Sequence, residues 1–292
     1  MTATRTSMYR TPLTALFALS TLLLAAGCTT DGIATKPDPL AGDIIDEAQL
    51  TELMLTAGDP DSAVRYFERG LAREPERADF RRNLAKSYAR AKRFPEAART
   101  YQELIALNQE QPSDRLDYAY VAVRLGRWQD AEALATQIPG TIDSERRHLL
   151  DAMLADRAQN WDAADSAYAR AEVKATNPAD VLNNWGVSLM SRGELERAED
   201  TFQRAISYDS RLFSAKNNLA LSRGLRRDYR LPIVPLTSEE RAVVSYNLGV
   251  IALRQGDKRI ARGLFAKAVD EHPRHYQAAA DQLAQLEGAV VQ

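Results

Sequence analysis

The sequence is poor in the residues from which most enzyme and metal sites are built. Its 292 residues include one cysteine and three histidines. An intramolecular disulfide is therefore impossible, and a Cys/His metal site has few ligands to draw on. The sequence contains no GxSxG nucleophile motif, no HExxH metal motif and no glycine-rich phosphate loop. We therefore expect no enzymatic activity, no cofactor or metal and no small-molecule substrate.

The sequence also has no long hydrophobic run of the kind that crosses a membrane. Its most apolar stretch, residues 13–26, covers 14 residues, whereas a membrane-spanning helix needs about 20. Arg5 and Arg10 precede this stretch without any acidic residue, and small residues occupy 25–27. This layout is typical of a cleaved secretory signal. A transmembrane anchor is the less favoured alternative.

The only cysteine, Cys28, directly follows this predicted signal. The stretch LLLAAGC, which ends at Cys28, resembles the bacterial lipobox, in which a diacylglycerol is attached to the cysteine before the signal is removed. The resemblance implies a lipoprotein that carries fatty acid, such as palmitate, at Cys28. Thr29 in place of an aspartate implies the outer membrane of a Gram-negative bacterium, facing the periplasm. The alternative is a plain secretory signal with an incidental cysteine.

The sequence has no excess of positively charged residues either. Without Arg5 and Arg10, 36 of the 38 Lys and Arg residues remain against 40 Asp and Glu. A mildly acidic chain gives no electrostatic support for a nucleic-acid partner. Residues 28–43 are polar and rich in Gly and Pro, as in a flexible tether. We expect a signal peptide at 1–27, a lipidated tether at 28–43 and a folded domain at 44–290.

The folded part contains a repeat of about 34 residues. In residues 178–211, two amphipathic segments flank a turn, and the small residues Gly186 and Ala198 stand where two helices would cross. The alanine recurs at steps of 34, 34, 33, 34 and 63, as Ala63, Ala97, Ala131, Ala164, Ala198 and Ala261. This pattern resembles the tetratricopeptide repeat. The resemblance implies an all-α solenoid of helix–turn–helix units in a right-handed superhelix.

The repeat positions predict the boundaries of the units. The complete repeats are expected at about 44–77, 78–111, 112–144, 145–178, 179–212 and 237–275, and a capping helix at 276–290. The step of 63 leaves residues 213–236 as an unpaired helix followed by an extended strap. Pro232 and Pro235 favour extended backbone before them, and we expect residues 229–236 to cover the surface that a second helix would have covered.

An asparagine recurs at one position of four first helices. The four residues are Asn83, Asn184, Asn218 and Asn247. In the tetratricopeptide family the first helices line a groove, and this pattern resembles the asparagine ladder of its peptide-binding members. An amide can pair with an extended peptide because it offers a donor and an acceptor together. The alternative is that these amides bond neighbouring helices.

A run of cations follows in one of these helices. Arg82, Lys86 and Arg90 are four residues apart, a spacing at which like charges cost a few tenths of a kcal/mol. These three cations therefore do not stabilise the helix. Tyr120 and Arg124 hold corresponding positions in the next repeat. Together these residues predict a basic, partly aromatic groove for a carboxylate or an acidic segment, and the alternative is a solvated cationic face.

A lipobox followed by tetratricopeptide repeats resembles the outer-membrane lipoproteins that assist pilus and secretion machines. Residues 231–279, beginning LPIVPLTSEERAVVSYN, resemble the TadD-like lipoproteins of the tight-adherence (Flp pilus) assembly system. The resemblance implies an anchored scaffold or adaptor that binds the secretin or other pilus assembly proteins through its groove, in a pilotin-like role. The alternative is an adaptor for envelope proteases or peptidoglycan enzymes.

Overall fold

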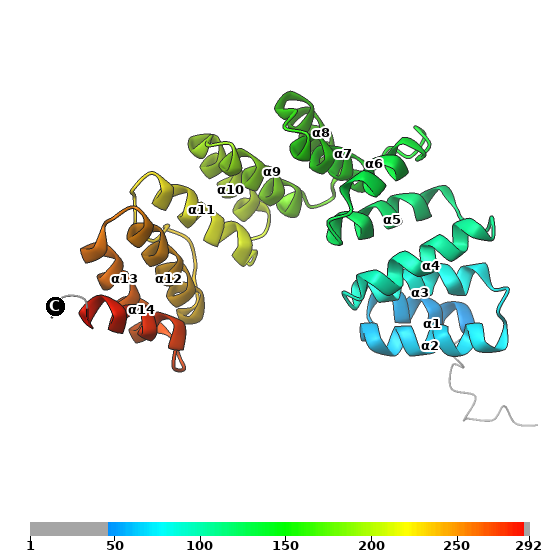
Figure 1. Cartoon of the computed structure of the whole chain (residues 1–292), viewed down its shortest axis with the longest axis horizontal. Coiled ribbons are helices and arrows are strands. Elements are labelled where there is room, and N and C mark those ends of the chain that lie inside the picture. Colours follow the sequence, from blue (N-terminus) through cyan, green and yellow to red (C-terminus); the bar gives the residue numbers. More distant parts are fainter. Residues whose placement is uncertain (1–45, 289–292) are drawn as a thin grey trace, which may run out of the picture. The chain divides into compact units, whose positions relative to one another are not determined.

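The computed structural model describes residues 46–288. The predictions for the signal, Cys28 and the tether lie outside these residues. Within them the chain forms 14 α-helices and no strand, as the sequence predicts (Figure 1). None of these helices is both long and apolar enough to span a membrane. The helices are α1 (Glu47–Thr56), α2 (Pro60–Arg73), α3 (Ala78–Arg90), α4 (Phe94–Ala106), α5 (Pro112–Arg124), α6 (Trp128–Thr136), α7 (Glu145–Arg157), α8 (Trp161–Lys174), α9 (Ala179–Ser191), α10 (Leu195–Tyr208), α11 (Phe213–Leu225), α12 (Ser238–Arg254), α13 (Lys258–Glu271) and α14 (Gln277–Gly288).

Each helix packs chiefly on its neighbours in the sequence. The recurring alanine lies at the crossing of the two helices of a pair, and all six copies are completely buried. On the first helices α9 and α12, a glycine lies where an aromatic ring of the second helix packs. A Cβ atom added to Gly186 would lie 2.5 Å from the ring of Phe202, and one added to Gly249 would lie 2.7 Å from Phe265. The small residues therefore set how closely the paired helices approach.

The turn after each first helix has the same backbone conformation from the second repeat onward. One residue there has a positive φ, between 56° and 87°, in each of six turns: Lys92, Gly126, Gln159, Gly193, Arg227 and Gly256. Side chains other than glycine cost about 1–2 kcal/mol in this region. Arg227 follows α11, which has no second helix after it. The chain thus begins the usual turn there and then leaves it.

Residues 228–236 lie in the non-helical connection between α11 and α12, which runs from 226 to 237. Leu231 packs against the core formed by Ala220, Val244 and Leu248, whereas Val234 packs against the cluster of Leu189, Ala198, Phe202 and Leu219. The ammonium of Lys216, a residue that is 4% exposed, donates to the carbonyl of Pro235 at 2.9 Å and to Glu240 at 3.0 Å. Two apolar side chains and one buried lysine therefore hold the segment on the helices.

Candidate functional site

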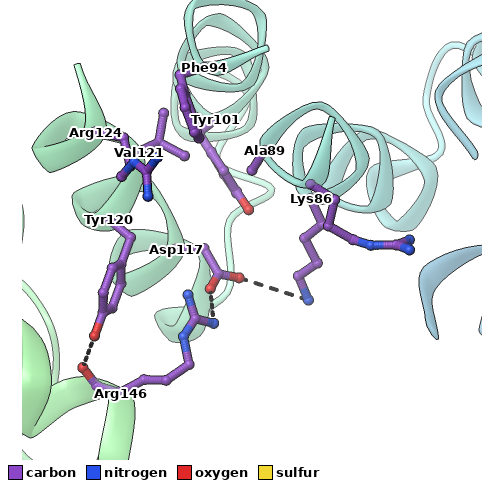
Figure 2. Close-up of a pocket in the computed structure, with 10 residues that line it drawn as sticks. Lys86, Ala89, Phe94, Tyr101, Asp117, Tyr120, Val121, Arg124 and Arg146 are labelled. Carbon is purple, nitrogen blue, oxygen red and sulfur yellow. Dashed lines mark hydrogen bonds and ion pairs between the residues drawn. The ribbon is translucent and has the colours of Figure 1, made fainter. Parts of the chain in front are cut away.

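A cavity of about 430 Å³ lies among α3, α4, α5 and the start of α7 (Figure 2). Four cationic side chains line it, and Asp117 is the one acid in its wall. The wall therefore carries three positive charges in excess. The remaining lining residues are apolar or aromatic. The complete set is Lys86, Ala89, Arg90, Phe94, Tyr101, Asp117, Tyr120, Val121, Arg124 and Arg146.

Asp117 lies between two of these cations, as Figure 2 shows. Its carboxylate is 2.5 Å from a guanidinium nitrogen of Arg146 and 3.9 Å from the ammonium of Lys86. The side chain of Asp117 is 11% exposed, whereas those of Lys86 and Arg146 are 38% and 55% exposed. Both cations thus keep contact with solvent, where an incoming anion could reach them.

Aromatic rings lie beside two of the charged side chains in the cavity wall. The hydroxyl of Tyr120 donates to the carbonyl of Arg146 at 2.6 Å, and the Arg146 guanidinium lies 4.8 Å from the centre of the Tyr120 ring. Arg124 lies in the same way over Phe94, at 5.0 Å. Burial raises the pKa of Tyr120, so its hydroxyl stays neutral and protonated at physiological pH. The rings hold two guanidinium groups by cation–π contact and leave their N–H edges to other partners.

The structure brings Lys86, Tyr120 and Arg124 together as the sequence suggests, but it separates Arg82 from them. Arg82 is 8% exposed, and its Nε donates to Asp114 at 2.8 Å. Arg90 lines the cavity, but its guanidinium donates to the carbonyls of Met54 and Gly58 at 2.7 and 2.8 Å. Arg82 is thus engaged outside the cavity, whereas Lys86 and Arg90 line it, which corrects the expected single stripe of three cations.

Two of the four predicted asparagines bond a neighbouring first helix. The amide nitrogen of Asn218 donates to Asn183 at 3.1 Å, and that of Asn247 donates to Asn217 at 2.8 Å. Each of these hydrogen bonds uses one N–H of the donating amide and one oxygen lone pair of the accepting amide. The other N–H and the oxygen of Asn218 and Asn247 can still bond other partners. The other two predicted amides donate no hydrogen bond to any residue between 46 and 288: Asn83 and Asn184.

Among the residues that give the cavity a charge or a cation–π contact, three were not expected from the sequence: Phe94, Asp117 and Arg146. Asp117 stands three residues before Tyr120, so helical spacing alone could have placed the two on one face. Arg146 comes from the next repeat, where it is the second residue of α7. Its side chain reaches back to α5, and no local pattern signals such a contact. Only the packing of consecutive repeats reveals it.

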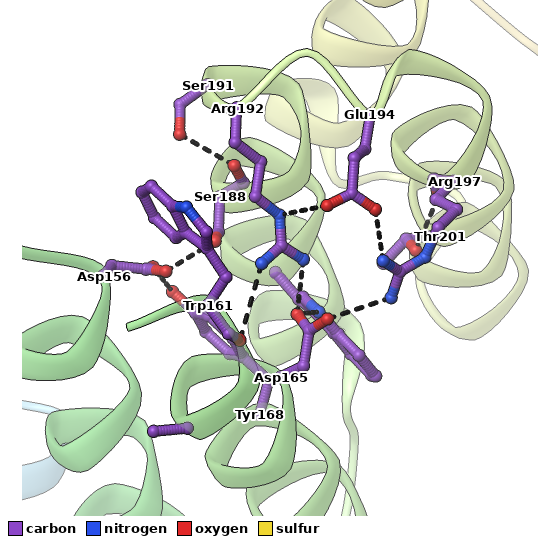
Figure 3. A network of polar contacts seen from close by, with 12 residues as sticks. Asp156, Trp161, Asp165, Tyr168, Ser188, Ser191, Arg192, Glu194, Arg197 and Thr201 are labelled. Carbon is purple, nitrogen blue, oxygen red and sulfur yellow. Dashed lines mark hydrogen bonds and ion pairs between the residues drawn. The ribbon is translucent and has the colours of Figure 1, made fainter. Parts of the chain in front are cut away.

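A second polar cluster joins α8, α9 and α10 (Figure 3). Asp165 accepts hydrogen bonds from Trp185 at 2.7 Å, Arg192 at 2.6 Å and Arg197 at 3.0 Å. Burial acts to raise the pKa of Asp165, but these three hydrogen bonds outweigh it and hold the pKa below its usual value. The Arg192 side chain is 5% exposed. Its guanidinium pairs with Asp165 at 2.6 Å and with Glu194 at 2.9 Å, so this cluster stabilises the fold and offers little to a ligand.

The family model of the tetratricopeptide repeat matches residues 53–115, 149–214 and 246–282, which together make up more than half of the chain. The chain belongs to the tetratricopeptide repeat family. The two internal stretches that the model leaves unmatched contain the nine-residue helix α6 and the connection between α11 and α12. The repeat fold predicted from the sequence is thereby confirmed, and proteins built from such repeats serve as scaffolds for other proteins.

Solved structures support the same fold. A chain of the APC/C hetero-tetramer Cut9–Hcn1 is similar with a TM-score of 0.56 at 15% identity, over 82% of this chain and 48% of that one. This tetratricopeptide protein thus spans about half the length of that chain. A tetratricopeptide repeat protein from Parabacteroides merdae has a TM-score of 0.52 at 17% identity, over 82% of this chain and 96% of that one. A search of curated proteins gives no match.

Proposed function

We propose that this protein is an outer-membrane-anchored scaffold that binds partner proteins during assembly of a Flp (type IVb) pilus or secretion apparatus. The lipobox-like stretch at Cys28 and the resemblance of residues 231–279 to TadD-like lipoproteins support this assignment. The cavity supports partner binding, because it combines three excess positive charges with the aromatic rings of Phe94, Tyr101 and Tyr120.

The cavity fits an acidic segment of a partner protein. A carboxylate that enters it would meet Lys86 on one side and the guanidinium of Arg124 or Arg146 on the other, and Arg can hold a carboxylate through two parallel hydrogen bonds. Phe94 and Tyr120 offer apolar surface to the neighbouring residues of the same segment. In the free protein Asp117 holds Lys86 and Arg146 in place, so little ordering is left for the ligand to impose.

The test is recovery of partners from detergent-solubilised envelopes of a pilus-forming strain. The wild type should recover secretin and pilus assembly components, and Lys86→Gln/Arg124→Gln should recover at least tenfold less. Arg69→Gln/Arg73→Gln is the matched control, because it removes two exposed cations from α2 and should bind like the wild type. Envelope proteases or peptidoglycan hydrolases in place of pilus components would support the alternative adaptor function. Undiminished recovery by the cavity variant would remove the cavity from the proposal.

The anchor requires a separate test. Cys28→Ser removes the sulfur that the lipobox resemblance assigns to the diacylglycerol. Metabolic labelling with palmitate should therefore mark the wild type and leave the variant unlabelled, and the variant should lose its association with the outer-membrane fraction. A labelled Cys28→Ser protein would contradict lipidation at this residue.

A further inference from the structure

The second helix of the last repeat, α13, differs in charge from its counterparts. The first turns of α2, α4, α6, α8 and α10 each contain an acid, which the positive end of the helix dipole favours. The first turn of α13 contains no acid, and Lys258 and Arg259 stand there instead. Arg262 and Lys267 follow on the same helix. We call these four exposed residues the α13 basic face: Lys258, Arg259, Arg262 and Lys267.

The α13 basic face has no internal counter-charge. None of its four cations forms an ion pair with a residue between 46 and 288, whereas most arginines elsewhere in that range do. Two of the nearby acids are engaged by other cations: Asp257 holds Arg227 at 2.7 Å, and Glu271 pairs with Arg241. Asp270 stands one turn after Lys267 but forms no ion pair with it. Cations at the helix start and at i, i+3 and i, i+4 spacing reduce helix stability, so folding does not account for them.

The shape of this face limits what it can bind. A Cβ atom added to Gly263 would meet nothing within 4 Å, and Ala266 is small and exposed, so open surface lies between the cations. Ile260 is 38% exposed on the same helix. This open, cationic surface contrasts with the cavity on α3 and α5, in which rings and a carboxylate shape a pocket. An extended anionic surface matches it better than a single acidic side chain.

We propose that the α13 basic face docks on the anionic headgroups of a phospholipid bilayer. Lys and Arg near an anionic membrane each add a favourable increment that falls off within the screening length. An exposed isoleucine beside them can enter the headgroup region. Lipid attachment at Cys28, as predicted, would keep a bilayer within reach and raise its effective concentration. This proposal concerns a second contact with the membrane and does not depend on which protein the cavity binds.

The test uses a chain that begins at residue 29, so that neither the predicted signal nor Cys28 contributes to membrane binding. The repeats from Glu47 onward form a compact unit by themselves, and such a chain keeps them all. It should sediment with phosphatidylcholine vesicles that contain phosphatidylglycerol and much less with vesicles of phosphatidylcholine alone. Added salt should release it.

Arg259→Gln/Arg262→Gln should lower partition onto the anionic vesicles by roughly thirtyfold. Arg259→Lys/Arg262→Lys keeps the charge and should bind like the wild type, as should Arg69→Gln/Arg73→Gln on α2. Thermal melts should show the glutamine variant at least as stable as the wild type, because it removes repulsion. Equal partition of the wild type onto both kinds of vesicle, or full binding by the glutamine variant, would overturn the proposal and leave an acidic protein as the partner to test.

Discussion

At the scale of single residues, two cations one helical turn apart in α3 have different roles. Arg82 and its partner Asp114 are 8% and 1% exposed, and Arg82 also donates to the carbonyl of Gln109 at 3.0 Å. Lys86 is partly exposed and lies at the edge of the cavity, 3.9 Å from Asp117. The first residue links consecutive repeats, and the second is free to meet a ligand.

Substitution should separate these roles. Arg82→Met should lower the free energy of unfolding by about 3 kcal/mol, because it leaves the carboxylate of Asp114 buried with a backbone N–H but without its cation. Lys86→Gln should change stability by less than about 0.5 kcal/mol, since exposed ion pairs contribute little. Urea unfolding of both variants measures the difference. Similar stability losses in the two variants would contradict the assignment.

At the scale of elements, the sequence predicts which helices exist but not what each polar side chain meets. The recurring Ala and Gly residues depend on local spacing along one chain segment, and all were placed correctly. Arg82 was misplaced because its carboxylate partner, Asp114, lies in the next repeat, and Arg146 was missed because its contacts lie in the preceding repeat. Contacts between repeats depend on packing angles, which local spacing does not encode.

The crossing of α9 and α10 gives a direct test of the close approach. Gly186→Val would place branched carbon atoms against Phe202, whose ring lies 2.5 Å from the position of an added Cβ. Overpacking of this kind typically costs about 1–3 kcal/mol, and we expect the upper part of that range. Gly263→Val on α13, where an added Cβ meets nothing within 4 Å, is the matched control. Thermal denaturation should show a lower Tm for the first variant only.

The connection between α11 and α12 depends on Lys216. Lys216→Met keeps a side chain of similar length but removes the donor to Pro235 and the partner of Glu240. Loss of one member of a buried pair costs about 3–5 kcal/mol, and residues 228–236 should become the first site of proteolytic cleavage. Arg211→Gln is the control, because the side chain that it replaces is 91% exposed. The protease should cleave this variant at the same rate as the wild type. Unchanged cleavage of Lys216→Met would show that Leu231 and Val234 suffice to hold the segment.

At the scale of the whole molecule, repeats contact mainly their neighbours, so stability accumulates along the chain from repeat to repeat. Carboxylates contribute to this stability in both the N-terminal and the C-terminal half of the chain. Hydrogen bonds to Ser62, Arg77 and Lys174 lower the pKa values of Asp59, Asp79 and Asp143, and a hydrogen bond from Arg230 lowers that of Asp228 to about 2. A lowered folded-state pKa gives stability above the usual pKa that is lost as the pH falls through the lowered value.

Asp165 is the place to test this dependence, because its three hydrogen bonds join helices of two repeats. Its stabilising effect should be complete above its usual pKa of 3.8 and should disappear as acid protonates the folded carboxylate. Asp165→Asn should therefore lower the urea midpoint strongly at pH 7, where it also removes one of the two carboxylates that pair with the buried guanidinium of Arg192. The difference from the wild type should shrink as the pH falls below 3.8 and acid protonates the wild-type carboxyl. Asp162→Asn, one turn earlier on α8 and exposed, is the control and should follow the wild type at every pH. A difference between Asp165→Asn and the wild type that stays constant from pH 7 to pH 3 would mean that packing at this position, rather than charge, joins the two repeats.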